Sequence, residues 1–318
     1  MARTDSPRTI PAGTGVAGLG CVVVPAHDEA AVIGRLLRAL TAGGVDLEVV
    51  VVANGCTDAT AEVARAFPGV RVLETPVPSK MHALALGDRH VSRFPRFYVD
   101  ADVVIGTRDL SALGAALSEP GVHAAGPERS LDLAASSWPV RAYYSVWCRL
   151  PGVERELYGR GVIAVDEAGH RRIAGWRDTM ADDLVAAMSF TPEELRVVPG
   201  AHVLIRPPRT YGDLLRRRVR AMTGNRQLAG DPDAPPLRGA GGGVRTVVAL
   251  VRRDPALLPA VTVFLGTAVL ARARARWAVA RGSTVWLRDE SSRRVDPPAG
   301  PRSTPTPAAS TSRAERSS

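Results

Sequence analysis

The sequence is poor in several residue types, and each shortage excludes a class of protein. Its three cysteines, Cys21, Cys56 and Cys148, form no Cys-x-x-Cys pair, which argues against a zinc cage or a disulfide framework. Isolated thiols fit a reducing, cytoplasmic compartment best. Aromatic residues make up only 5% of the chain, too few for a surface that stacks the bases of single strands.

Lysine is almost absent as well. Lys80 is the only one, so the formal net charge of +9 comes from arginine. An arginine-rich surface attracts phosphate groups in nucleic acid, in anionic lipid or on a small substrate, and charge alone does not choose among them. We expect no nucleic-acid partner, because no aromatic or helix-turn-helix pattern accompanies the arginines.

Both ends of the chain lack apolar runs. Residues 1–18 are rich in Pro, Gly, Thr and Arg without an apolar h-region, so we expect a disordered arm and not a signal peptide. Residues 293–318 are rich in Pro, Ser and Arg, and we expect disorder there too.

Short apolar runs alternate with helical patterns through the first hundred residues. We expect buried strands at 21–24, 47–52, 70–73 and 96–99, and helices at 29–42, 57–67 and 80–90. This order predicts an α/β fold with a doubly wound, Rossmann-like, mostly parallel sheet and flanking helices. Ligands on such sheets bind beyond the carboxyl ends of the strands.

The second half is less regular. We expect a helix at 140–150, a strand at 161–165, a helix from Asp182 to Ser189, two short strands at 195–198 and 202–205 paired with each other, a basic helix at 211–228 and a Gly/Pro-rich linker at 230–243.

Two aspartates directly follow the fourth expected strand. Asp100 and Asp102 are one residue apart, where two carboxylates can share a hard cation such as Mg²⁺ or Mn²⁺. Such an ion offsets the charge on a leaving diphosphate. Turn aspartates are common after strands, but the position of this pair after a βα series favours a metal site.

Polar loops also follow the first two strands. His27 and Glu29, in the loop that begins at Pro25, can hydrogen-bond a base and a ribose. Asn54, before the tight turn at Gly55, can pair with a base edge. A helix entry and a capping turn are equal alternatives for these two loops.

Lys80 and Asp183 are expected at helix starts. Ser79 can cap the helix that Lys80 begins, and a cation there opposes the helix dipole unless a phosphate binds. Asp183 suits the dipole, but its carboxylate can also act as a general base toward an acceptor hydroxyl. Asp182 can cap the helix.

The basic helix at 211–228 has an apolar stripe that contains Leu215, Val219 and Met222. Arg218 falls beside this stripe, where an arginine needs an anionic partner. A diphosphate or Asp183 would serve, and a structural ion pair is the alternative.

Residues 256–271 are uncharged, and Arg272, Arg274 and Arg276 follow them. The run is shorter than the ~20 apolar residues of a membrane span, and Pro259 interrupts it. It fits either a helix packed on the catalytic domain or an interfacial helix anchored by arginines.

Taken in order, these motifs resemble those of family 2 glycosyltransferases over about residues 19–228. The family's P-x-Y-N-E, D-D-G-S-T-D, K-x-x-A-L-N-x-G, D-x-D, E-D and Q-R-x-R-W-x-x-G motifs correspond to 25–29, 53–58, 80–87, 100–102, 182–183 and 217–224.

The resemblance implies the GT-A fold with a C-terminal helical extension and an inverting transfer, of hexosyltransferase type, from a nucleoside-diphosphate sugar. It implies Asp183 and Arg218 as catalytic, Pro25, His27, Glu29, Asn54, Lys80, Asp100 and Arg220 as donor-binding, and Asp100 and Asp102 as metal ligands.

Departures from the family motifs limit what the resemblance implies. Ala53 and Asn54 replace an acidic pair that often contacts uracil, so UDP, GDP and dTDP donors all stay open. Ala221 replaces a tryptophan associated with polymer acceptors, which favours a non-processive enzyme. A retaining enzyme on the same fold also stays open.

Two other functions compete. A sugar-phosphate nucleotidyltransferase shares the fold, but it usually has a glycine-rich, basic loop after the first strand, whereas 25–29 is acidic and glycine-free. A non-catalytic sugar-nucleotide-binding scaffold would explain Ala53, Ala85 and Ala221, although the aspartates Asp100, Asp102 and Asp183 argue against it.

The expected organisation follows. We predict a nucleotide-sugar-binding half at 19–110, an acceptor-binding half with the basic helix at 111–230, and a linker with an apolar helix at 231–292. We expect a small-molecule or lipid-linked acceptor and a cytoplasmic protein, with contact to the inner face of the cell membrane through 256–276 as one of the two alternatives for that helix.

Overall fold

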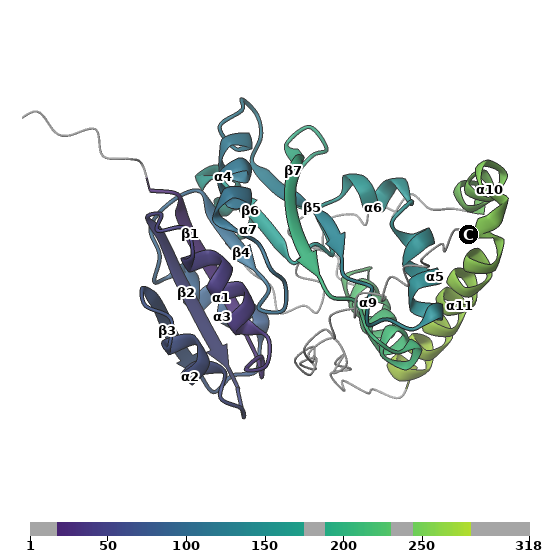
Figure 1. The fold of residues 1–318 in the computed structure, drawn as a ribbon, viewed down its shortest axis with the longest axis horizontal. Coiled ribbons are helices and arrows are strands. Elements are labelled where there is room, and N and C mark those ends of the chain that lie inside the picture. The colour runs from purple at the N-terminus through teal and green to yellow at the C-terminus, as the bar shows by residue number, and fades with distance from the viewer. Residues whose placement is uncertain (1–17, 175–187, 230–243, 281–318) are drawn as a thin grey trace, which may run out of the picture.

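A computed structural model describes residues 18–174, 188–229 and 244–280. In these residues seven strands form one sheet in the order β3-β2-β1-β4-β6-β5-β7 (Figure 1). The predicted arm, tail and linker, and the segment with Asp182 and Asp183, lie outside the described residues.

The first half of the chain alternates strand and helix as predicted. Its elements are β1 (Gly20–Ala26), α1 (Ile33–Thr41), β2 (Leu47–Asn54), α2 (Thr60–Arg65), β3 (Val70–Thr75), α3 (Lys80–Asp88) and β4 (Arg96–Val99). Helix α1 begins four residues later than predicted, because Asp28 has a positive φ of 49° and residues 30–32 form a turn.

The second half supplies the rest of the sheet and the outer helices. Its elements are α4 (Thr107–Ala116), β5 (Ala124–Leu131), α5 (Trp138–Trp147), α6 (Pro151–Arg155), β6 (Val162–Val165), α7 (Glu167–Ile173), β7 (Leu195–Ile205), α9 (Tyr211–Ala229), α10 (Val244–Arg253), a 3₁₀ turn η1 (Pro255–Leu257) and α11 (Leu258–Ala280).

Strand β6 runs antiparallel to β4 and β5, and the other neighbouring strands are parallel. The carboxyl ends of β1, β2, β4, β5 and β7 therefore share one edge of the sheet with the amino end of β6. The loops at this edge come from both halves of the chain. We call it the carboxyl edge.

Both faces of the sheet are covered, which explains the nearly continuous valine runs of β1 and β2. Val22 and Val24 face a core with α1, α2 and α4. Cys21 and Val23 alternate onto the opposite face, whose core includes α3 and α7.

One predicted pairing is wrong. Residues 195–198 and 202–205 do not pair with each other but belong to the single strand β7, and both parts pair with β5. Pro199-Gly200 resembles the turn of a hairpin in sequence. Here it belongs to a bulge opposite Pro127 and Glu128, after which the strand continues.

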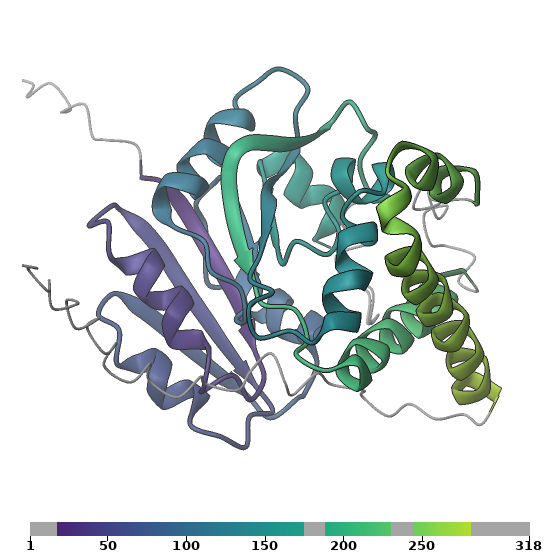
Figure 2. The ribbon, with the colours of Figure 1, turned by 45° about the vertical axis from the view of Figure 1, so that its right-hand side comes forward.

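A layer of helices lies beyond β7 (Figures 1 and 2). Helix α11 packs against α5 and α9. Leu215 and Val219 of α9 are buried with Ala271 and Ala275 of α11, so the predicted apolar stripe of the basic helix is confirmed. Thr267 is fully buried on the same side of α11 and donates to the hydroxyl of Tyr211 at 3.2 Å.

Candidate active site

The two predicted metal ligands follow β4 at the carboxyl edge, where Asp100 pairs with the only lysine of the chain. Lys80 Nζ lies 2.6 Å from Asp100 Oδ1, and both side chains are about a third exposed. Ser79 caps α3 as predicted, since its hydroxyl accepts from the backbone N–H of His82. Asp100 therefore offsets the unfavourable position of Lys80 at a helix start.

Gly161 holds the next turn close to Asp100. Its φ is +68°, and a Cβ there would lie 2.7 Å from Val103 and 3.2 Å from a carboxylate oxygen of Asp100. The backbone N–H of Asp100 also donates to the carbonyl of Gly161 at 2.8 Å. Only glycine fits this conformation and contact together.

Two arginines hold the loop that leads into Gly161. Arg160 is 2% exposed and donates to the carbonyls of Pro127, Glu154 and Glu156 at 2.6–2.9 Å. Arg129 of β5 donates to the carbonyl of Val153 at 2.6 Å and to that of Tyr158 at 3.0 Å.

Burial lowers the pKa of both guanidinium groups, and that of Arg160, which also lies near the charge of Arg129, falls to about 9. The predicted site did not include Arg129, Arg160 or Gly161. No local motif identifies them, because their contacts depend on which strands are neighbours in the sheet.

The loops after β1 and β2 are joined to each other. The side chain of Asn54 is buried, and its Nδ2 donates to the carbonyl of Ala26 at 2.9 Å. Gly55 forms the predicted tight turn with a φ of 58°, where a Cβ would meet Pro78 at 2.7 Å. Asn54 thus braces the strand ends through its amide.

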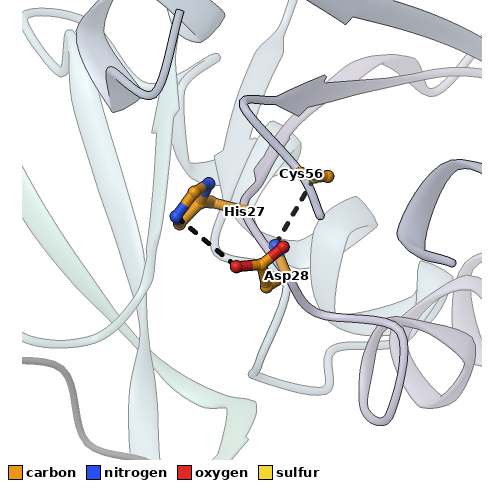
Figure 3. Close-up of side chains that lie close together, drawn as sticks. All are labelled: His27, Asp28 and Cys56. Atoms are coloured by element: carbon orange, nitrogen blue, oxygen red, sulfur yellow. Dashed lines mark hydrogen bonds and ion pairs between the residues drawn. The ribbon is translucent and has the colours of Figure 1, made fainter. Parts of the chain in front are cut away.

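His27 and Asp28 follow β1 and lie beside Cys56, which follows β2 (Figure 3). His27 Nδ1 lies 2.6 Å from the carbonyl oxygen of Asn54. Glu29, the other predicted nucleoside contact, is 7% exposed, and its backbone N–H donates to Thr60. Pro25 is buried within β1.

Five residues separate the end of β7 from the start of the basic helix α9, which therefore also starts from the carboxyl edge. The guanidinium of Arg218 is half-buried and lies 5.9 Å from the centre of the Tyr143 ring. Arg220 is half-buried too, whereas Arg216 is exposed and pairs with Asp213.

The family model for glycosyltransferase-like family 2 matches residues 20–156. This segment contains the loops after β1, β2 and β4, with Asp100, Asp102 and Lys80. Over this segment the chain matches the sequence of family 2 glycosyltransferases.

A known glycosyltransferase is similar to part of this chain. The 4,4'-diaponeurosporenoate glycosyltransferase of Staphylococcus aureus is 33% identical over 94 residues, which is 28% of this chain and 25% of the relative. The match therefore spans about a quarter of the relative's length.

A solved structure agrees with the fold over a longer stretch. The mannosyltransferase PcManGT from Pyrobaculum calidifontis, in complex with GDP-Man and Mn²⁺, superposes with a TM-score of 0.57 at 20% identity. The superposition covers 81% of this chain and 86% of that one. This chain thus has the GT-A fold that the sequence predicts.

Proposed function

We propose that this chain moves a sugar from a nucleoside-diphosphate donor to an acceptor hydroxyl, one transfer at a time and with inversion of the anomeric carbon. The observation that carries this proposal is the pair of Lys80 and Asp100 at the carboxyl edge, next to Asp102. A cation between a helix start and two carboxylates suits a diphosphate with its metal ion.

The two aspartates fit a hard divalent ion. Asp100 and Asp102 offer only carboxylate oxygens, which Mg²⁺ and Mn²⁺ prefer. The side chain of Asp100 is 30% exposed, so a substrate can reach it. When bound, the ion offsets the charge on the leaving diphosphate. The GDP-Man and Mn²⁺ bound to PcManGT support the same class of donor here.

Cationic side chains hold the donor phosphates in this proposal. Lys80 reaches them from the start of α3. Arg218 reaches them from α9, together with Arg220. In the part of the chain that the structure describes, no carboxylate pairs with Arg218, so an anionic group of the substrate suits this half-buried guanidinium.

His27 and Glu29 contact the nucleoside from the loop after β1. Pro25 and Asn54 shape the ends of the two strands beneath it. The halves at 19–110 and 111–230 then bind donor and acceptor respectively.

Asp183 acts as the general base. The acceptor hydroxyl oxygen attacks the anomeric carbon, its proton passes to the Asp183 carboxylate, and the bond to the diphosphate oxygen breaks with its electron pair on the diphosphate. General-base help is worth about 10²–10⁴-fold, so Asp183→Asn lowers turnover by that range. Asp182→Asn is the matched control, and equal turnover in wild type and Asp183→Asn overturns the assignment.

The donor is tested first. UDP-, GDP- and dTDP-sugars are incubated with the full chain and Mn²⁺, and the released nucleotide is identified. We expect a nucleoside diphosphate, with release lost in Asp102→Asn. Release of pyrophosphate with a sugar phosphate supports a nucleotidyltransferase instead. Nucleotide binding without any turnover supports the scaffold. NMR spectroscopy of the product's anomeric carbon tests inversion.

We also infer that α11 lies on the inner surface of the cell membrane. By length and composition, residues 255–277 could cross a bilayer, and an 18-residue window within them has a mean hydropathy of 1.8 and is 28% buried. The side away from α5 and α9 is apolar and exposed. Its exposed residues are Leu258, Leu265, Val269, Leu270 and Trp277, at 45–64%.

An interfacial position fits α11 better than a span. Its uncharged part, 258–271, is about 21 Å long at 1.5 Å per residue, shorter than the ~30 Å hydrocarbon core. Arg272, Arg274 and Arg276 are exposed in its last turns, and Arg252 and Arg253 are exposed just before η1. Arginines at both ends of an apolar face suit an anionic lipid surface.

Vesicle co-sedimentation tests this position. We expect the full chain to bind phosphatidylglycerol vesicles more than phosphatidylcholine vesicles. Leu265→Glu/Val269→Glu should abolish binding, whereas Val45→Glu, at an equally exposed apolar residue elsewhere (47%), should not. Equal binding by both variants contradicts the inference.

A further inference from the structure

Three different metal-ligating side chains meet where β1 and β2 end. Among the residues that the structure describes, His27, Asp28 and Cys56 form a group whose ligand atoms all lie within 4.8 Å of one another (Figure 3). His27 Nε2 lies 3.7 Å from Asp28 Oδ2. Two ligands on a tetrahedral zinc ion are about 3.3–3.6 Å apart, given Zn–N, Zn–O and Zn–S bonds of about 2.0–2.3 Å.

The histidine is oriented for metal binding. Its Nδ1 lies 2.6 Å from the carbonyl oxygen of Asn54, and a carbonyl only accepts hydrogen bonds. The ring proton is therefore on Nδ1, and the lone pair is on Nε2, the atom on the side of Asp28. Zinc-binding histidines commonly donate their other ring nitrogen to a carbonyl or carboxylate in this way.

The other two side chains are held against the histidine. Asp28 has a positive φ of 49°, which is uncommon for a residue other than glycine. Its Oδ1 accepts from the backbone N–H of Thr57 at 2.6 Å, so Oδ2 remains on the His27 side. The backbone N–H of Asp28 lies 3.4 Å from Cys56 Sγ, where it stabilises a thiolate.

We propose that His27, Asp28 and Cys56 bind a Zn²⁺ ion, with water as the fourth ligand. This site is separate from the carboxylate pair of Asp100 and Asp102. Mixed nitrogen, oxygen and sulfur ligands suit zinc, whereas the all-oxygen pair suits Mg²⁺ or Mn²⁺. The two sites therefore select different ions by ligand chemistry.

Zinc at this position has a consequence for the donor. His27 is also the nucleoside contact of the proposed function, and this step rests on that proposal. A ring nitrogen bound to zinc no longer hydrogen-bonds a base or a ribose. Zn²⁺ should then inhibit turnover in competition with the donor, while Mn²⁺ supports it.

Cobalt is the probe, because a thiolate bound to Co²⁺ gives a ligand-to-metal charge-transfer band. The full chain is stripped with EDTA, titrated with Co²⁺ and back-titrated with Zn²⁺. We expect a thiolate-to-cobalt band of the intensity of one thiolate-bound Co²⁺ per chain, and loss of the band on adding Zn²⁺. Cys56→Ser should remove the band, and His27→Gln should weaken binding by more than about 10-fold.

Matched variants separate this site from the rest of the molecule. Cys148→Ser changes another half-buried thiol and should leave the band unchanged. Asp100→Asn/Asp102→Asn should also keep the band. Circular dichroism verifies that each variant is folded.

Three outcomes overturn the zinc site: no band in the wild type, a band that persists in Cys56→Ser, or one that disappears in Cys148→Ser. A normal cobalt band with turnover that Zn²⁺ leaves unchanged keeps the metal site and refutes the nucleoside role of His27 instead. Failure of the one proposal is thereby distinguished from failure of the other.

Discussion

Replacing Lys80 by methionine should move two affinities in opposite directions. The ammonium of Lys80 lies 2.6 Å from Asp100, and no other lysine exists in the chain. Without it, Asp100 and Asp102 keep their full negative charge, so the free protein binds Mn²⁺ more tightly. The donor diphosphate loses a cationic partner, so it binds more weakly.

The magnitudes separate a functional role from a structural one. Two unit charges 4 Å apart attract by about 4 kcal/mol at an effective dielectric constant of ~20. Both side chains are about 30% exposed, so solvent reduces the contribution of the pair to folding to about 1 kcal/mol or less. A charge-assisted hydrogen bond to phosphate is worth about 1.5–3 kcal/mol, or roughly 10- to 100-fold in Kd.

Calorimetry with Mn²⁺ alone, and then with Mn²⁺ and a nucleoside diphosphate, measures both affinities. Urea unfolding measures stability. Lys80→Arg keeps the charge and should recover most of the nucleotide affinity. Arg71→Met removes an arginine 3.6 Å from Glu48 and should change neither affinity. Weaker Mn²⁺ binding in Lys80→Met, or a stability loss well above 1 kcal/mol, would refute the reasoning.

Two further predictions concern stability. Gly161→Ala should lower the free energy of unfolding by about 1–3 kcal/mol and weaken Mn²⁺-dependent nucleotide binding, because the new Cβ meets Val103. Gly266→Ala is the control, since a Cβ there has no atom within 4 Å, and it should change neither quantity. Equal effects of the two substitutions would count against the contact with Val103. Burial, with a neighbouring arginine, lowers the pKa of His170 in the folded chain. Its contribution is present above the unfolded pKa of ~6.5 and is lost as pH falls below it. Urea midpoints at pH 8 and 5.5 should differ more in wild type than in His170→Gln, and parallel shifts would contradict this.

The parallel half of the fold was predictable because its strands are buried on both faces. Uninterrupted valine runs identify β1 and β2, and β4 begins and ends where the sequence predicts. Strand β5 was not predicted, since its sequence, AAGPERSL, includes glycine, proline and charged residues. It becomes a strand by pairing with β6 and β7, and no local pattern contains that information.

A site residue was predictable only where the strand or helix next to it was recognisable in the sequence. Asp100, Asp102 and Lys80 follow strands or begin helices, so their convergence follows from topology. The contact between His27 and Cys56 depends on the register of β1 with β2, in which Ala26 lies beside Ala53. The two residues are separated by 29 positions, and the spacing of the cysteines alone did not indicate that they lie close together.

The apolar helix after 256 fitted two interpretations from the sequence. In the structure one side of α11 packs against α5 and α9, and another side leaves apolar residues exposed. Small residues, Ala271 and Ala275, face α9, and larger ones face away from the protein. A hydropathy average cannot separate such faces, because it ignores direction around the helix.

Helix α9 contacts both α11 and α5, and this limits where the chain can be truncated. Its Leu215 and Val219 are covered by α11, and the same helix carries Arg218 over Tyr143. Removing everything after 257 to improve solubility would uncover those apolar side chains and loosen the helix that carries the arginine. Crystallisation trials should therefore keep α11 and use detergent to cover its exposed apolar residues.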